Sequence, residues 1–187
     1  MLTSEAIDKN RSGTGRIALF VTLGTETVFF LTALVAYVAL RGQVEWNVSH
    51  SIDRLIIPLA NTAVLLISAG AAWWAVRAVH SGRLANVKLP LIATLLLGLL
   101  FIGGQMYEFN HAGLSIDDQA LGGVFFTLIV FHAIHVFAGM VFHGLNLARA
   151  YQYDFSPAES SVIVLGTWFW YYVTAVWLVL FAALYLL

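Results

Sequence analysis

Long apolar stretches dominate the chain, and short polar segments separate them. A helix needs about 20 apolar residues to cross the hydrocarbon core of a bilayer. Five stretches reach that length: Ile17 to Leu40, Ile56 to Val76, Leu89 to Phe109, Gln119 to Leu147 and Val162 to Leu187. We therefore predict an all-α integral membrane protein with a short tail, residues 1–16, and one five-helix transmembrane domain, residues 17–187.

Composition supports a membrane protein. Of the 187 residues, 60% are hydrophobic and 10% are charged, against about 25% charged in a typical soluble domain. The first apolar stretch is too long for the core of a signal peptide, so we expect a retained helix. The polar tail before it should have little fixed structure. Cysteine is absent, which excludes disulfides, thiolate metal sites and cysteine nucleophiles.

The basic residues between the spans predict an orientation. Two of them, Arg41 and Arg54, fall on one side of the predicted bundle. The other seven fall on the opposite side: Lys9, Arg11, Arg16, Arg77, Arg83, Lys88 and Arg149. Since lysine and arginine collect on the cytoplasmic side, we expect a cytoplasmic N-terminus and a periplasmic C-terminus, as in a multi-pass protein of a bacterial inner membrane.

Glu26 is the one charged residue that is predicted to lie well inside a span. Its depth is about 14 Å from the inner end of the first helix at 1.5 Å per residue. An ionised carboxylate is costly at that depth. Three interpretations remain open. Glu26 forms an interhelical hydrogen bond, exchanges a proton, or anchors a lipid or a neighbouring subunit.

Three histidines, His132, His135 and His143, are predicted to lie along one stripe of the fourth span. A membrane-embedded histidine indicates a protein interior, a lipid head group or a proton path. In the simplest alternative, each ring bonds a backbone carbonyl by itself.

Depth counting predicts a shared polar layer. Counted from the inner ends of their spans, His135 and Thr174 lie at the same level, with Glu26 and Tyr171 about one turn below. If these faces point at one another, the four side chains form one membrane-embedded, proton-active group.

A second polar cluster is predicted near the outer side, where Asn61, Gln105 and Glu108 lie at similar heights on the second and third spans. Glu108 is close enough to the helix end to reach interfacial water, so ordinary solvation is the competing interpretation.

The remaining histidines do not favour a cofactor in this chain. A bis-histidine haem needs a second span with a histidine at matching depth, but His50, His80 and His111 fall in loops or at span ends. The zinc signature HExxH is missing, and one carboxylate with two histidines makes a poor metal site. Trp168, Trp170 and Trp177 in the last span are interpreted as packing and lipid-contact groups.

Several segments together resemble subunit III of the haem-copper oxidases, the group that contains cytochrome c oxidase and the bacterial quinol oxidases. The resemblance covers nearly the whole chain. The segments, in family order, are Thr25 to Phe30, Asn61 to Ser68, Gly104 to Glu108, Phe125 to Gly139 and Trp170 to Trp177.

The last segment departs from the family. The family usually has a histidine after the first tryptophan and an aspartate three residues further on. In this chain Trp170 and Trp177 are kept, but Tyr171 and Thr174 occupy those two positions. The departure puts in doubt any role that needs a charge at this level.

The resemblance implies a non-catalytic subunit III of a proton-pumping terminal respiratory oxidase. It implies no haem or copper in this chain, haem and copper in partner subunits I and II, and phospholipid held in the cleft between the first helices and the rest of the chain. Support of proton uptake, protection during turnover and an oxygen route are its implied roles, with cytochrome c or quinol as the donor to other subunits. Alternatives are a quinol oxidase subunit III, an accessory subunit of nitric oxide reductase, or, in a different class, a small proton-coupled transporter. The transporter is disfavoured because no internal repeat is visible and no proline interrupts any span.

Overall fold

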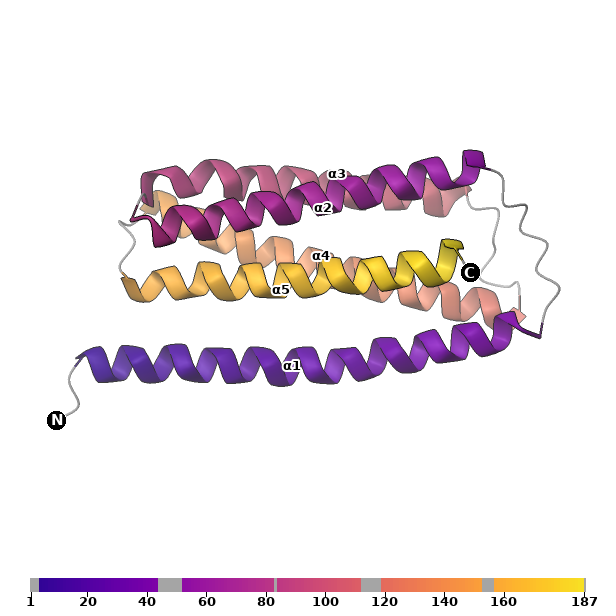
Figure 1. Cartoon of the computed structure of the whole chain (residues 1–187), viewed down its shortest axis with the longest axis horizontal. Helices are drawn as coiled ribbons and strands as arrows, with labels where there is room; N and C mark the ends of the chain where they lie inside the picture. Colours follow the sequence, from indigo (N-terminus) through magenta and orange to yellow (C-terminus); the bar gives the residue numbers. More distant parts are fainter. Residues whose placement is uncertain (1–3, 44–51, 83, 112–118, 153–156, 187) are drawn as a thin grey trace.

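The computed structural model describes residues 4–43, 52–82, 84–111, 119–152 and 157–186. Neighbouring helices run in opposite directions along one bundle, so the two termini lie at opposite ends (Figure 1). Among the described residues, five helices are long and apolar enough to cross a membrane, which confirms the five predicted spans. They are α1 (Ser4–Arg41), α2 (Ile52–His80), α3 (Lys88–His111), α4 (Gln119–Gln152) and α5 (Pro157–Phe181), with a 3₁₀ turn, η1 (Leu84–Val87), before α3 and a π-helical turn, η2 (Ala182–Leu186), after α5.

Each helix extends beyond the apolar stretch that predicted it at one end or at both. The N-terminal segment was expected to have little fixed structure, but α1 begins at Ser4, 13 residues before Ile17. An existing helix adds a further residue at little cost, since nucleation is the costly step. The prediction that no proline interrupts a span is wrong for α2, where Pro58 lies inside the helix and cannot donate a backbone hydrogen bond.

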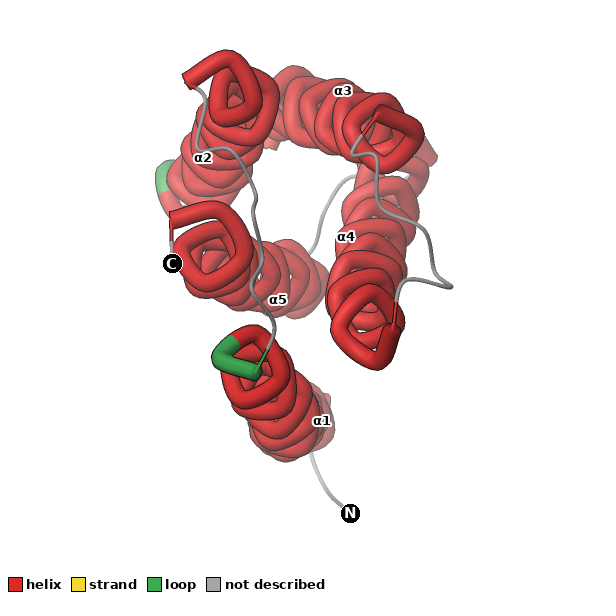
Figure 2. Tube along the Cα trace, turned by 90° about the vertical axis from the view of Figure 1, so that its right-hand side faces the viewer, coloured by secondary structure: helices red, strands yellow, loops and turns green. Residues whose placement is uncertain are grey.

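Four helices form the core of the bundle, and α1 lies at its edge. Viewed along the axes, α2, α3, α4 and α5 surround a common centre, and α1 stands outside next to α5 and α4 (Figure 2). Within the most apolar 18-residue window of α5, 50% of the residues are buried. In the corresponding window of α1, only 6% are buried. The outward side chains of α1 therefore face lipid or another protein.

Aromatic rings hold basic side chains at the end of the bundle where α1 begins. The guanidinium of Arg16 lies 5.9 Å from the centre of the Trp168 ring, and that of Arg77 lies 5.3 Å from Trp73. Lys88 Nζ lies 4.5 Å from the Tyr151 ring. Cations over ring faces are attracted by the ring quadrupole, and such amphipathic pairs are typical of a membrane interface.

Candidate functional site

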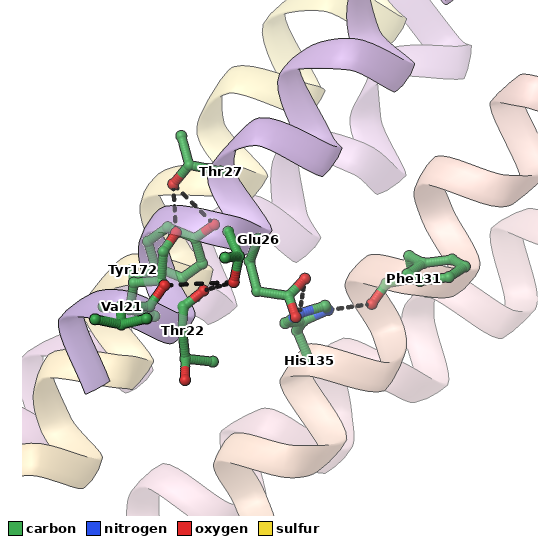
Figure 3. Close-up of polar contacts among 9 residues, drawn as sticks. Val21, Thr22, Glu26, Thr27, Phe131, His135 and Tyr172 are labelled. Atoms are coloured by element: carbon green, nitrogen blue, oxygen red, sulfur yellow. Dashed lines mark hydrogen bonds and ion pairs between the residues drawn. The ribbon is translucent and has the colours of Figure 1, made fainter. Parts of the chain in front are cut away.

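A carboxyl and an imidazole meet near the middle of their spans. Oε2 of Glu26, on α1, lies 3.1 Å from Nε2 of His135, on α4, and the two side chains point at each other across the gap between the helices (Figure 3). Glu26 is 13 residues from one end of its span, Gly13–Arg41. Its depth is therefore about 20 Å at 1.5 Å per residue.

The second ring nitrogen of His135 fixes the tautomer. Nδ1 lies 2.6 Å from the carbonyl oxygen of Phe131, and a carbonyl only accepts, so Nδ1 carries a hydrogen. The short contact between Nε2 and Glu26 then requires one further proton. That proton lies either on the carboxyl, beside a neutral imidazole, or on Nε2, beside a carboxylate. The pair is neutral overall in both arrangements, and the transfer spans only the 3.1 Å between the two atoms.

Aromatic side chains surround the pair. The ring of His135 makes an edge contact with Phe30, with centroids 5.2 Å apart, and is stacked on Phe169 at 6.5 Å. His135 is 12% exposed, whereas Glu26 is 32% exposed. The imidazole is therefore held by packing, and the carboxyl retains an open side toward the surroundings of α1.

The polar partner that α5 contributes is not the predicted one. Tyr171 is exposed, and the hydroxyl of Thr174 donates to the carbonyl of Trp170 in its own helix at 2.9 Å. Instead, the hydroxyl of Tyr172 lies 3.2 Å from Oγ1 of Thr27, the residue after Glu26. The predicted four-residue layer is therefore wrong in its α5 members. Depth gives the level of a residue but not the direction of its side chain, and Tyr171 and Tyr172 point about 100° apart on a helix.

The three histidines of α4 do not share one environment. His132 and His143 are buried in the bundle, where they pack against Trp177 and Trp170, whereas His135 turns toward α1. A spacing of 11 residues returns a helix to within about 20° of the same face, but a spacing of three leaves a difference of about 60°. The ring nitrogens of His132 and His143 have no hydrogen-bond partner within the described residues. Only His135 bonds a backbone carbonyl, and it also contacts Glu26.

The predicted outer cluster divides between two contacts. Nδ2 of Asn61 donates to the carbonyl of Phe101 at 3.4 Å, and Nε2 of Gln105 lies 3.4 Å from Oε2 of Glu108. Glu108 also bonds the hydroxyl of Tyr185, in η2. The sequence reasoning missed Tyr185, because its position against α3 depends on how the end of α5 packs.

Two tryptophans fasten α5 to α2. Nε1 of Trp170 donates to Oγ of Ser68, and Nε1 of Trp177 donates to Oγ1 of Thr62, each at 3.0 Å. Both indoles are fully buried. A Cβ at Gly139 would lie 2.6 Å from the Trp170 ring, so the ring packs directly on the α4 backbone. The interpretation of these two residues as packing groups agrees with this arrangement.

The site contains a carboxyl and an imidazole, but within the described residues no three His, Cys, Asp or Glu side chains gather in a way that could hold a metal ion. The arrangement is suited to holding and moving a proton.

Comparison with known proteins identifies the family. The family model described as cytochrome c oxidase subunit III matches residues 16–187. This chain belongs to the cytochrome c oxidase subunit III family. A protein of Nocardia farcinica named "Probable cytochrome c oxidase subunit 3" is 30% identical, and the match covers 98% of this chain and 93% of the relative. Cytochrome c oxidase subunit 3 of the lancelet Branchiostoma lanceolatum is 32% identical over 90% of this chain and 67% of its own length.

Family membership and the five helices together make this chain a multi-pass membrane protein. The residues that match the family model include all five segments on which the resemblance was based. Within that match, Glu26 and His135 form the mid-membrane pair, and Trp170 and Trp177 form the two buried anchors of α5.

Proposed function

We propose that this chain is the non-catalytic third subunit of a proton-pumping terminal respiratory oxidase of the cytochrome c oxidase type. Such an oxidase reduces oxygen to water with haem and copper that partner subunits carry. The full-length match to a relative named as an oxidase subunit 3 supports this role. Partner subunits I and II would dock on the lipid-facing sides of the bundle, where apolar side chains are exposed over long stretches.

The contact between Glu26 and His135 carries the functional part of the proposal, which is support of proton uptake. The pair holds one proton between Nε2 and Oε2 and stays neutral when that proton moves, so a transfer in the low-dielectric interior creates no net charge. The open side of Glu26 can exchange the proton with a water or a partner side chain.

The N-terminus is proposed to lie in the cytoplasm and the C-terminus in the periplasm of a bacterial inner membrane. The cation and ring pairs of Arg16, Arg77 and Lys88 at the end where α1 begins support this orientation, because basic residues favour the cytoplasmic side.

We further propose that phospholipid acyl chains cover the outward face of α1, where Val21, Val28 and Val35 are exposed.

Replacement of Glu26 by glutamine in the intact complex tests the proton role. The amide keeps the size of the side chain and can donate to Nε2 of His135, but it has no titratable proton. We expect proton uptake during turnover to slow and the number of turnovers before inactivation to fall, by about threefold or more each, with unchanged subunit composition. Stopped-flow proton uptake and turnover lifetime are the measurements.

Glu108→Gln is the matched control, because it makes the same chemical change at the outer cluster, away from His135. It should leave both measurements unchanged. Wild-type uptake and lifetime in Glu26→Gln would reduce the pair to a structural contact.

Purification through a tag on this chain tests membership of the complex. Haem bands in a redox spectrum, together with oxidase subunits I and II in mass spectrometry, are expected. Activity with quinol instead of cytochrome c would indicate a quinol oxidase, and nitric oxide reductase subunits would indicate that enzyme. A haem-free protein migrating alone would favour a proton-coupled transporter.

A further inference from the structure

An exposed stripe of α5 lies between the sides of the helix that contact α2 and α1. Trp170 is bonded to Ser68 of α2, and Tyr172 lies against Thr27 of α1. Successive residues of a helix point about 100° apart, so Tyr171 points between these two neighbours, which stand on either side of α5 (Figure 2). The exposed residues that continue this direction along the helix form the α5 stripe: Tyr171, Ala175, Leu178, Val179 and Ala182.

Tyr171 gives the α5 stripe a polar group inside the membrane. The side chain is 36% exposed, and its hydroxyl has no hydrogen-bond partner among the described residues. The span begins at Ser161, ten residues earlier, so Tyr171 lies about 15 Å deep at 1.5 Å per residue. Hydrocarbon offers no acceptor at that depth, and a hydroxyl without a partner is destabilising there.

Exposed threonines in the same bundle avoid this cost. Thr25, Thr32 and Thr127 are exposed, and each hydroxyl donates to a carbonyl of its own helix at 2.7 to 2.8 Å. A tyrosine ring holds its hydroxyl far from the backbone of its own helix, so Tyr171 cannot satisfy itself in this way. Its partner has to come from whatever covers the α5 stripe.

The depth and shape of the stripe favour a helix over a lipid as the occupant. A phospholipid keeps its ester and head-group oxygens near the membrane interface, so its chains bring only methylene groups to the level of Tyr171. A transmembrane helix can place a polar side chain at that depth. Ala175 and Ala182 follow Tyr171 by 4 and 11 residues on the same stripe, and small side chains let the backbone of another helix approach closely.

We propose that the α5 stripe docks a transmembrane helix of another oxidase subunit, and that a side-chain oxygen of this helix accepts a hydrogen bond from Tyr171. A carboxyl, an amide or a hydroxyl side chain provides such an oxygen. The inference rests on the proposed membership of an oxidase complex and adds to it the docking face and the chemistry of the contact.

Photo-crosslinking in the intact complex tests the docking face. The photoreactive residue p-benzoylphenylalanine replaces Ala175, and the complex is purified through this chain, irradiated and analysed by mass spectrometry. An adduct with a transmembrane segment of another oxidase subunit is expected. The same residue in place of Val28, on the α1 face proposed for acyl chains, should give adducts with lipid instead.

Two adjacent tyrosines provide matched variants for the hydrogen bond. Tyr171→Phe removes only the hydroxyl that would donate to the partner, so dissociation of that subunit in detergent, followed by native mass spectrometry, should become about two- to tenfold faster. Tyr172→Phe removes a hydroxyl that contacts Thr27 within this chain and should leave the dissociation rate unchanged.

Three results would overturn the proposal. If oxidase subunits are present but the adduct at Ala175 contains lipid or a second copy of this chain, no partner helix lies on the α5 stripe. Equal dissociation rates in the wild type and in Tyr171→Phe would exclude the hydrogen bond. A preparation without oxidase subunits would overturn the proposed function as well.

Discussion

The last helix, α5, and the first helix, α1, are both long and apolar, but the bundle holds them in different ways. Half of the most apolar part of α5 is buried. Its indoles at Trp170 and Trp177 donate to hydroxyls of α2, and these hydroxyls donate in turn to backbone carbonyls, Ser68 to Leu65 at 2.6 Å and Thr62 to Pro58 at 2.7 Å. Each buried polar atom in this chain of contacts therefore has a partner.

α1 has few such anchors. It is bound to α4 through Glu26 and His135 and through the rings of Phe29 and Phe131, with centroids 4.4 Å apart. It is bound to α5 through Thr27 and Tyr172. Exposed threonines elsewhere on α1 satisfy themselves, as Thr25 does by donating to the carbonyl of Thr22 at 2.8 Å.

The comparison separates structural polar groups from the candidate functional pair. In lipid, apolar surface provides little drive for helix association, so packing and interhelical hydrogen bonds decide which helices stay together. α5 has both and acts as the centre of the fold. α1 places an ionisable carboxyl at mid-membrane, and only 6% of its most apolar part is buried, which leaves most of its surface for lipid or partner subunits.

The largest expected effect is on α5. Trp170→Ala removes a fully buried ring and its bond to Ser68, so the free energy of unfolding should fall by about 3 to 5 kcal/mol, measured by SDS titration with circular dichroism in mixed micelles. Trp73→Ala removes an exposed ring under Arg77 and should cost no more than about 1 kcal/mol. Equal losses would contradict the central role of α5.

The contact between α4 and α5 should tolerate little added volume. A Cβ at Gly139 would meet Cε3 of Trp170 at 2.6 Å, whereas one at Gly144 meets nothing within 4 Å. Gly139→Ala should therefore lower the free energy of unfolding by about 1 to 3 kcal/mol. Gly144→Ala should be neutral or stabilising by up to about 1 kcal/mol. The same SDS titration compares them, and identical midpoints would show that Trp170 can move away.

Two threonine substitutions compare a hydroxyl that bonds another helix with a hydroxyl that bonds only its own helix. Thr62→Val removes the acceptor of the Trp177 indole and should lower the free energy of unfolding by about 1 kcal/mol. Thr25→Val removes a hydroxyl that bonds only its own helix and should change it by less than about 0.5 kcal/mol. The reverse order in SDS titration would show that the indole N-H finds another acceptor.

Replacement of Glu26 is expected to change the global stability least. The effect of this replacement should be confined to α1. Glu26→Leu leaves Nε2 of His135 without its partner, so α1 amides should exchange with deuterium about fivefold faster while α5 is unchanged, because local opening of an edge helix is independent of the core. Hydrogen exchange with mass spectrometry is the measurement. Glu26→Gln, which keeps a hydrogen bond, should exchange as the wild type does; exchange raised equally in α5 would make α1 part of the core.

The sequence predicted the depth of a residue along its helix better than it predicted the direction of its side chain. It placed Glu26 and His135 near the same depth, and the structure brings them into contact. The same reasoning selected Tyr171 and Thr174, although Tyr172 is the residue that faces α1. It also placed His132, His135 and His143 on one stripe, although His135 alone turns toward Glu26. The outer cluster was found without Tyr185, whose position depends on the π-helical turn η2.

By itself, the sequence determined the five spans, the helical class and the family resemblance, because the length and apolar character of each stretch are local properties that a bilayer selects directly. The tertiary structure alone decided the rotation of each helix and hence the partner of each polar side chain. The physical reason is that lipid and the bundle interior are about equally apolar. Hydropathy therefore does not mark an inner face in a membrane helix, and only the packing of Trp170 on Gly139, or of Glu26 against His135, sets it.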